Sequence, residues 1–586
     1  MANNVRQRGQ PTELVAALRK CRPAFVVLAL FSMFINMLML APAIYMLQVY
    51  DRVLGTGSVE TLLMLSLIMA GALVVISAME SNRTSITIRI GVWLTEQLGP
   101  VLIARSVRAR LSGDTAGAQP MRDLAQLQSF IATNGFSLIF DAPWSPVYIL
   151  LIWLMHPVLG MTALVGALLM IALTVLNNLL TRRETVTANA EQLVATQQVD
   201  AAARNAEAIE AMAMLPAIIA RWREQNRTAM SALLKGLELG SSVQASTRFV
   251  RLALQSGVLG LGALLVIKGE LTGGAMIASS ILLGRAMSPV ELAVGAWRNF
   301  LTTRIAYQRI QLLLLQTPAE QPRMLLPAPK GRVDVENLTF VPDAGAAPVL
   351  RRVSFAIESG EAVAIIGPSA AGKSTLGRFL VGLGTPTSGS VRLDGFELGD
   401  WDRQQLGQHI GYLPQDVELF AGSVRANIAR MDPAADDVKV HEAALLAHAH
   451  EMIAGLRGGY DCQIGDGGAR LSAGQRQRIG LARAVYGTPR LIVLDEPNAN
   501  LDTAGESALA ASLAALKAQG CALAIIGHRP STLAQADKLM LLQDGAVEAF
   551  GPREEVLQRL RDAMANKRRA AEQQETADQP LVPMQR

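Results

Sequence analysis

Six apolar stretches in the first half of the chain set the strongest limit on its fold. Each is long enough, or nearly so, to cross about 30 Å of hydrocarbon as a helix of about 20 residues. The chain is 51% hydrophobic and only 18% charged, which exceeds the apolar content of a soluble enzyme. The stretches are Phe25–Leu47, Leu62–Met79, Phe136–Leu154, Leu159–Leu179, Val250–Val266 and Met276–Val294. The sequence therefore predicts an N-terminal segment over residues 1–23, followed by a six-helix transmembrane domain over residues 24–315.

Positive charge in the connecting segments predicts the orientation of these spans. Arginines and lysines gather before the first span, between the second and third, and between the fourth and fifth. The three intervening loops are short and carry few of them. Because positively charged loops stay in the cytoplasm, we expect both termini and both long loops there. The long loops contain few helix breakers, so we expect them to continue the spans as helical rods.

Two carboxylates within the predicted spans have alternative interpretations. A charged group inside a span normally faces a partner or a cavity. For Asp141 we favour a position in the headgroup region, where it would cap a helix that begins near Pro143. For Glu291 the two interpretations are balanced. Pro143 and Pro146 also make the third span the least regular of the six.

The second half of the chain carries a phosphate-binding motif. Gly367, Gly372, Lys373 and Ser374 occupy the fixed positions of GxxxxGK[ST], between a short apolar run and a helix-like run. Glycines let backbone N–H groups approach phosphates, a helix start adds positive potential, and the Ser374 hydroxyl suits Mg²⁺. An ordinary glycine-rich turn is disfavoured by the partner motifs described below. We predict that a nucleoside triphosphate binds to Gly367, Pro368, Ser369, Ala370, Ala371, Gly372, Lys373, Ser374 and Thr375.

A second acidic motif follows within the same half. From about Gly331, short β-like runs alternate with turns and helices, which predicts an α/β domain with a largely parallel core sheet over residues 331–560. The apolar run 491–494 is typical of a buried strand that ends at Asp495 and Glu496, where ligands bind in open α/β sheets. Asp495 is suited to hold Mg²⁺ through water, and Glu496 to orient or deprotonate the attacking water.

The stretch LSAGQRQR, residues 471–478, resembles the LSGGQ signature of ABC-transporter ATPase domains. Gln415 resembles the Q-loop residue that touches Mg²⁺, His528 the switch histidine at the γ-phosphate, and Asp502 the D-loop aspartate. Residues 465–471 resemble the exporter X-loop. The resemblance covers the whole chain and implies a membrane domain of the type I ABC exporter fold followed by a P-loop ATPase, with ATP and Mg²⁺ as cofactors. It implies catalytic roles for Glu496, His528, Gln415 and Lys373, metal ligation by Ser374, Gln415 and Asp495, and nucleotide contacts from Ser472, Gly474, Gln475 and Asp502.

The signature predicts that the chain works in pairs. Ser472 and the N–H groups near Gly474 open a helix and offer donors to a phosphate. In the family that phosphate lies on the loop of the other subunit. Because this chain has one phosphate loop and one signature, we expect a homodimer with two sites.

Three positions depart from the family pattern. Ala473 replaces the first glycine of LSGGQ, a small change that we expect to preserve function. Asn498 begins the D-loop where serine is commoner. Pro342 stands near the place of a tyrosine that stacks on adenine in many exporters, which leaves Phe340 and Val349 as weak candidates for that contact.

Further passages resemble one branch of this family. MLQVYDRVL (46–54), FDAPWSPVYIL (140–150) and GRAMSPVELAVGAWRNF (284–300) look like the type I protein-secretion permease/ATPases of the PrtD-like alkaline-protease exporter branch. The resemblance implies an inner-membrane exporter of an unfolded polypeptide such as a protease, lipase or RTX-like protein, with an uncleaved C-terminal signal. It implies a membrane-fusion adaptor and a TolC-like outer-membrane channel as partners. The short segment before the first span disfavours relatives with an N-terminal peptidase domain.

Two rival functions stay open. A lipid or drug exporter of the same fold would be stimulated by small amphiphiles without an adaptor. A soluble-type ABC ATPase merely anchored by its spans is disfavoured, since one or two spans would suffice. No basic stripe indicates nucleic-acid binding, and the scattered cysteines and histidines support neither a disulfide framework nor a zinc site. We expect the charged tail, residues 561–586, to be disordered.

Overall fold

The computed structural model describes residues 12–111, 113, 117–317, 323–342, 345–468 and 470–562. It separates into two compact units, Met1–Ala319 and Glu320–Arg586, and each is described by itself. The expected N-terminal segment lies outside the described residues up to position 11, and the expected disordered tail from position 563.

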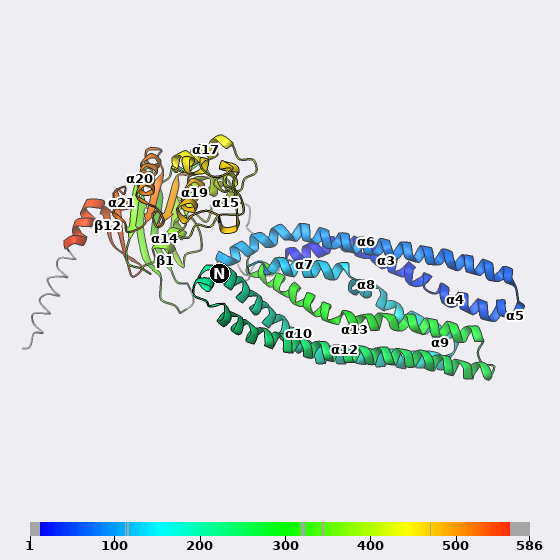
Figure 1. Ribbon diagram of the computed structural model, residues 1–586. Helices are drawn as coiled ribbons and strands as arrows, with labels where there is room; N and C mark the ends of the chain where they lie inside the picture. The colour runs from blue at the N-terminus through cyan, green and yellow to red at the C-terminus, as the bar shows by residue number, and fades with distance from the viewer. Residues whose placement is uncertain are drawn as a thin grey trace, which may run out of the picture. The chain divides into compact units, whose positions relative to one another are not determined.

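Long helices build the first unit (Figure 1). They are α2 (Glu13–Lys20), α3 (Arg22–Leu38), α4 (Ala41–Gln48), a π-helical turn (Val49–Val53), α5 (Leu54–Thr56), α6 (Val59–Leu111), α7 (Gln119–Ala132), α8 (Asn134–Asp141), a 3₁₀ turn (Ala142–Trp144), α9 (Ser145–Met155), α10 (Pro157–Arg204), α11 (Ala206–Ala211), α12 (Leu215–Ile267) and α13 (Gly273–Gln316). Six helical segments of the described residues are long and apolar enough to span a membrane, as predicted.

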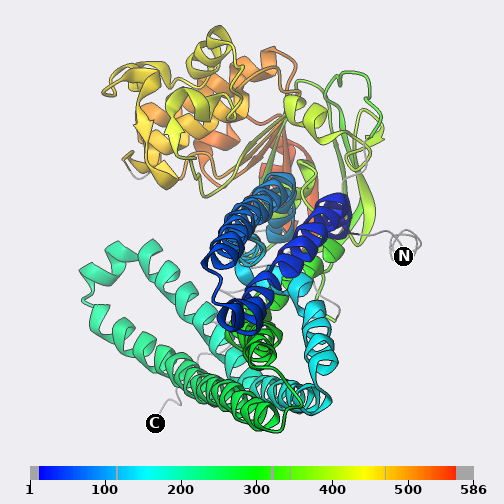
Figure 2. The same cartoon turned by 90° about the vertical axis from the view of Figure 1, so that its right-hand side faces the viewer.

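Four helices extend far beyond the predicted spans. The helix α6 has 53 residues, α10 has 48, α12 has 53 and α13 has 44, so each continues as a rod past its apolar part. This confirms that the long loops are helical. Helices α10 and α12 pack along each other, and Figure 2 shows this pair standing apart from the other helices around α11.

The first span is interrupted, and its far end is tied to α13. Pro42, near the start of α4, cannot donate a helical hydrogen bond, and the chain breaks after Leu38. Asp51, in the π-helical turn, accepts hydrogen bonds from the backbone N–H of Gly274 at 2.8 Å and from the Thr272 hydroxyl at 2.7 Å. A carboxylate at a helix N-terminus is favourable, so Asp51 stabilises the start of α13.

The capping role predicted for Asp141 was wrong. Its side chain makes no capping bond at the 3₁₀ turn that follows. It accepts instead from Arg83 of α6, at 2.9 and 3.0 Å, and from Asn36 of α3 at 3.0 Å. Tyr148 of α9 completes the network by donating to Asn36. An isolated charge in a span is costly, and the pairing with Arg83 compensates that of Asp141.

Glu291 also has a partner. Its carboxylate lies 2.9 Å from Arg251 of α12, so this pair joins α12 to α13. Both carboxylates that the sequence placed inside spans therefore serve contacts between helices.

Two sheets form the core of the second unit. Strands β12 (Ala546–Pro552), β11 (Lys538–Gln543), β3 (Ala362–Ile366), β10 (Ala522–Ile526), β9 (Leu491–Asp495) and β6 (Ile410–Leu413) form a six-stranded sheet in that order. All neighbours run parallel except β11 and β12. This confirms the predicted parallel core. Its central strands β3, β9 and β10 are almost fully buried, as their continuous apolar runs require.

A second, antiparallel sheet and several helices cover this core. Its order is β2 (Leu350–Ile357), β1 (Val333–Phe340), β4 (Ser388–Leu393) and β5 (Phe396–Glu397). The hydrophobic core includes residues from both sheets, such as Leu338, Ile365 and Val493. The helices that position the site are α14 (Lys373–Leu380), α19 (Ala473–Val485) and α20 (Thr503–Ala518), and a short pair of strands, β7 (Gly422–Ser423) and β8 (Gln463–Ile464), lies apart.

Candidate nucleotide site and the cavities of the bundle

The phosphate loop joins β3 to α14. At Gly367 a Cβ atom would lie 2.1 Å from the carbonyl oxygen of Leu542, so only glycine fits. Gly372 has φ +94° and caps α14, which leaves the first N–H groups of the helix directed into the loop. The Lys373 ammonium donates to the carbonyls of Gly367 at 2.9 Å and Pro368 at 2.8 Å. The loop therefore offers a positive charge, a helix start and backbone donors in one place, as a phosphate chain requires.

Asp495 lies beneath this loop at the end of β9. It is only 3% exposed. Burial raises the pKa of its carboxyl, Glu496 raises it further, and the hydrogen bond with Ser374 and the charge of Lys373 oppose the shift. Within the described residues, its buried Oδ1 atom has no hydrogen-bond partner. A carboxylate with a spare oxygen beside the Ser374 hydroxyl fits the oxygen ligands that Mg²⁺ prefers.

Glu496 turns away from the strand that carries Asp495. Its φ of +49° is left-handed, a strained conformation that is commonest at functional sites. Its backbone N–H donates to Ile526 of β10 at 2.9 Å, and its carboxylate accepts from the Gln415 amide at 3.1 Å. Gln415 follows β6, the parallel neighbour of β9. The structure thus brings together Glu496 and Gln415, which lie 81 residues apart in the sequence.

His528 reaches the same edge of the sheet. It follows β10, which lies between β3 and β9, and its side chain is exposed. Since parallel strands end at one edge, the phosphate loop, Asp495, Glu496, Gln415 and His528 all lie at the carboxyl ends of adjacent strands.

The signature forms the start of α19. The Ser472 hydroxyl accepts from the N–H of Gln475 at 3.2 Å, and the Gln475 side chain accepts from the N–H of Ser472 at 2.9 Å. This reciprocal capping box leaves an exposed, ordered helix N-terminus. Ala473 occupies the first helical position, so the added methyl group disturbs neither bond. Among the described residues, no hydrogen bond joins this helix start to the phosphate loop.

Gln477 is a site residue that the sequence did not reveal. It is 5% exposed. Its amide N–H group donates to the carbonyls of Glu496, at 3.3 Å, and Pro497, and its oxygen accepts from the N–H of Asn500 at 3.1 Å. The signature helix is therefore bonded to the loop that carries Glu496. The position of Gln477 in the sequence, two residues after Gln475, gave no indication of these partners.

The D-loop is held from two sides. Asn498, which replaces the commoner serine, is buried and donates to the Thr532 hydroxyl at 2.9 Å. Asp502 caps α20 by accepting from Gly505 at 2.8 Å, and it lies 3.4 Å from Arg478 of the signature helix. The Phe340 ring, a weak candidate for the adenine contact, packs edge-on against Phe379 with centroids 5.0 Å apart. The Phe340 ring thus packs against the hydrophobic core.

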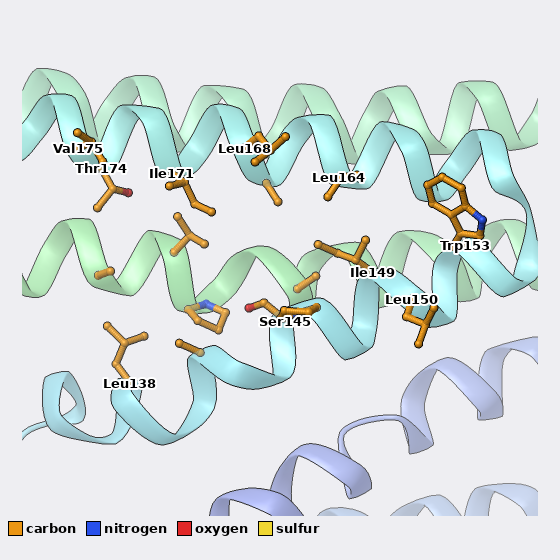
Figure 3. Close-up of a pocket in the computed structure, with 17 residues that line it drawn as sticks. Leu138, Ser145, Ile149, Leu150, Trp153, Leu164, Leu168, Ile171, Thr174 and Val175 are labelled. Atoms are coloured by element: carbon orange, nitrogen blue, oxygen red, sulfur yellow. The ribbon is translucent and has the colours of Figure 1, made fainter.

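The helical unit contains an apolar cavity of about 600 Å³ between α8–α9, α10 and α13 (Figure 3). Leu164, Leu168 and Ile171 of α10 line one side and Ile149 of α9 lies opposite. Its lining contains Ser145 and Thr174 but no charged side chain. This cavity can accept apolar groups and has no residue suited to acid–base chemistry.

Comparisons with known proteins agree with this arrangement. Residues 25–290 match the ABC transporter transmembrane region, and residues 350–499 match the ABC transporter family. The chain is 42% identical to the type I secretion system ATP-binding protein PrsD of Rhizobium meliloti (strain 1021), over 94% of this chain and 95% of the relative. It is 31% identical to the exotoxin translocation ATP-binding protein PaxB of Pasteurella aerogenes, over 93% and 78%. The structure of a bacterial Atm1-family ABC exporter with ATP bound has the same fold, with a TM-score of 0.81, 23% identity and coverage of 92% and 96%.

Proposed function

We propose a detailed function for this chain from one premise: it belongs to the ABC transporters, as an ATP-binding exporter of a type I secretion system. Its ATPase domain is coupled to transport, and six spans make it a multi-pass membrane protein. The chain exports an unfolded polypeptide with an uncleaved C-terminal signal, of the protease, lipase or RTX-like kind. Its relative PaxB is an exotoxin translocation protein, which supports a protein cargo.

The membrane location and the partners that we propose are those implied by the resemblance to the same family. The chain lies in the inner membrane of a Gram-negative cell, with the ATPase domain and both termini in the cytoplasm. A membrane-fusion adaptor and a TolC-like outer-membrane channel complete the path. The arginine-rich segments before the first span and in the two long helical loops support this orientation.

ATP is hydrolysed at the sheet edge described above. Lys373 and the start of α14 bind the phosphates, and His528 stabilises the charge of the transferring γ-phosphoryl group. Glu496, held by Gln415 at 3.1 Å, orients or deprotonates the attacking water. Ser374, Gln415 and Asp495 would hold Mg²⁺, which neutralises phosphate charge when bound.

Two copies complete two sites. In the described part of the chain, the exposed helix start at Ser472 makes no hydrogen bond to its own phosphate loop. Its donors are held by the capping box, so it suits a phosphate held by a second copy. We place Ser472, Gly474, Gln475 and Asp502 at the nucleotide of the partner subunit. Closure of the paired ATPase domains on two ATP molecules then moves the helical rods, and hydrolysis resets them.

One observation carries this proposal: a complete hydrolytic set converges at one sheet edge in a chain that also has six spans. Secretion of a reporter with a candidate C-terminal signal tests it. Wild-type cells should release the reporter, and Lys373→Ala cells should retain it because the phosphate loop loses its charge. Arg378→Lys, on the same helix, is the matched control. Release that continues in Lys373→Ala cells would contradict ATP-driven export of this cargo.

Replacing Glu496 by Gln tests its role. The amide keeps the shape but cannot take a proton, so we expect ATP binding to persist while turnover falls at least about 100-fold. Nucleotide binding and phosphate release should be measured on the same preparation. Glu442→Gln, at an exposed position of the second unit, should leave both unchanged. Normal hydrolysis in Glu496→Gln would remove Glu496 from catalysis.

The apolar cavity favours a second candidate, export of lipids or small amphiphiles. That function predicts that amphiphiles stimulate ATP hydrolysis and that export needs no adaptor. Polypeptide export predicts the reverse, so deletion of the adaptor separates the two.

A further inference from the structure

A second cavity in the helical unit is polar. It has a volume of about 570 Å³ and lies between α7, α10 and α13. Its lining includes Arg122, Arg298, Arg309, Asp123, Gln126 and Asn299. We call it the arginine pocket.

Among the residues that the structure describes, Arg309 is the one arginine of the pocket with an ion pair. Arg309 binds Asp123 through two hydrogen bonds, Nε to Oδ2 at 2.8 Å and Nη2 to Oδ1 at 2.5 Å. Asp123 is 2% exposed and also accepts from Gln119, so its carboxylate is fully engaged. Arg122 and Arg298 are exposed, and within the described residues neither has an ion pair. Three guanidinium groups against one carboxylate leave the pocket with a surplus of two positive charges.

Amides supply directional donors beside this charge. Gln126 donates to Asn299 at 2.7 Å and to the Thr302 hydroxyl at 3.2 Å, which fixes both side chains. The first of these bonds uses the oxygen of Asn299, and the amide group of Asn299 donates to no other described residue, so its N–H groups are available to a ligand. A guanidinium group pairs with a carboxylate through two parallel bonds, so such a pocket selects planar anions that also offer amide groups.

The pocket lies directly after the sixth span. The helix α13 lines the apolar cavity with Ala286, Pro289, Val290 and Ala293, and lines the arginine pocket from Gly295 onward. The two cavities therefore follow each other along one helix. At helical spacing the two sets of lining residues lie on opposite faces of α13, so the arginine pocket is a site separate from the apolar cavity.

We infer that the arginine pocket binds carboxylate groups of the polypeptide in transit, and so selects cargo segments rich in aspartate and glutamate. This inference rests on the proposed export of polypeptides. A polypeptide fits better than a lipid headgroup because three helices wall the pocket and its amides and hydroxyls match peptide groups. Although Asp123 is paired with Arg309, its negative charge repels a phosphate dianion more strongly than a singly charged carboxylate.

Binding to the full-length protein tests this directly. The protein is reconstituted in nanodiscs of phosphatidylcholine, and the probe is a short fluorescent peptide rich in glutamate with a free C-terminus. The matched peptide has glutamine at each glutamate and an amidated C-terminus. We expect the acidic peptide to bind about tenfold more tightly, with the difference shrinking at high salt.

Variants assign that difference to the pocket. Arg122→Gln with Arg298→Gln should abolish the preference, while Arg304→Gln, an exposed arginine of α13 outside the pocket, should retain it. Arg122→Glu with Arg298→Glu should favour a lysine-rich peptide instead. Equal affinity for both peptides, or an equal loss in Arg304→Gln, would overturn the inference. Displacement of the peptide by added phosphatidylglycerol would assign the pocket to lipid and also overturn it.

Transport separates this inference from the proposed function. If sealed vesicles take up both peptides equally in an ATP-dependent manner, export stands and the arginine pocket does not select. If they take up neither while the binding preference persists, polypeptide export fails although the pocket binds carboxylates.

Discussion

Gln477 shows how one buried side chain connects two motifs. Its amide group bonds the start of the signature helix to the carbonyls of Glu496 and Pro497 and to the N–H of Asn500. In the proposed dimer, the signature serves the partner's nucleotide and Glu496 serves its own. Gln477 is thus a positioning residue between the two sites.

Replacing Gln477 by Leu should lower kcat about 10- to 100-fold, because the carbonyls lose their donor and Glu496 shifts from its water. The phosphate loop is untouched, so KM for ATP should change little. Steady-state kinetics of the full-length protein measure both. Gln404→Leu, at an exposed position of the same unit, should change neither. A higher KM with unchanged kcat would show that Gln477 acts on binding instead.

The carboxyl group of Asp495 is suited to hold Mg²⁺, but its burial lowers the stability of the folded protein. Burial raises the pKa of its carboxyl above the ordinary value of 3.8. For an acid with a raised pKa, the stabilising contribution is complete below the unfolded-state pKa and is lost as the pH rises through the folded-state pKa. The ionised form therefore destabilises the nucleotide-free protein at neutral pH.

Asp495→Asn should accordingly raise the unfolding temperature at neutral pH, by roughly 2–4 °C for each kcal/mol regained, and abolish hydrolysis. The gain should shrink as the pH falls, because the raised pKa of the wild-type carboxyl favours its protonation in the folded protein. Thermal unfolding at one heating rate, without nucleotide or divalent cations, measures this. Asp400→Asn, at an exposed position, should show no such trend.

At the scale of helices, the pair of Arg83 and Asp141 fastens the kinked third span to α6. Ser32, Asn36 and Tyr148 add hydrogen bonds from α3 and α9. Within a span, removal of one partner leaves an uncompensated charge, whereas removal of both leaves none.

Asp141→Ala should therefore cost about 3–5 kcal/mol, and Arg83→Met combined with Asp141→Leu should cost much less. Thermal unfolding in nanodiscs, arranged as a double-mutant cycle, measures the difference. Glu224→Ala breaks an exposed pair with Arg227 and should have little effect. A double variant as unstable as Asp141→Ala would show that packing around the kink matters more than charge.

Elements and their contacts differ in how far the sequence predicts them. The six spans follow from apolar length, and Asp495, Glu496 and His528 could be placed together because parallel strands end at one edge. The partner of Asp141 could not be predicted, since it lies 58 residues earlier on a helix that is apolar on most sides. The rotation of α6 about its own axis, which decides where Arg83 points, is fixed only by packing. The hydrogen bonds of Gln477 could not be predicted for the same reason. They join the signature helix to backbone atoms of another loop, and the position of Gln477 in the sequence does not specify those atoms.

At the scale of the whole molecule, the chain should work only as a pair. A Lys373→Ala copy lacks a working phosphate loop, and a Ser472→Glu copy puts a carboxylate where the partner's phosphate must lie. Each should be inactive alone. A mixed dimer keeps one intact site, formed by Lys373 of one copy and Ser472 of the other.

Co-expression with two different purification tags isolates that mixed dimer. Its ATP hydrolysis should recover to at most about half of the wild-type rate, while each parent dimer stays near background. A Lys373→Ala dimer mixed with Lys373→Arg copies should not recover. Absence of recovery in the first mixture would contradict nucleotide sites shared between copies.

The 53 residues of α6 give a rod of roughly 80 Å at 1.5 Å per residue. A small tilt of so long a helix produces a large displacement at its end. A tilt of about 5° displaces its far end by roughly 7 Å, more than the pitch of one helical turn. A small rotation at one end of α6 therefore moves the other end by several ångströms, and the displacement grows with the length of the helix.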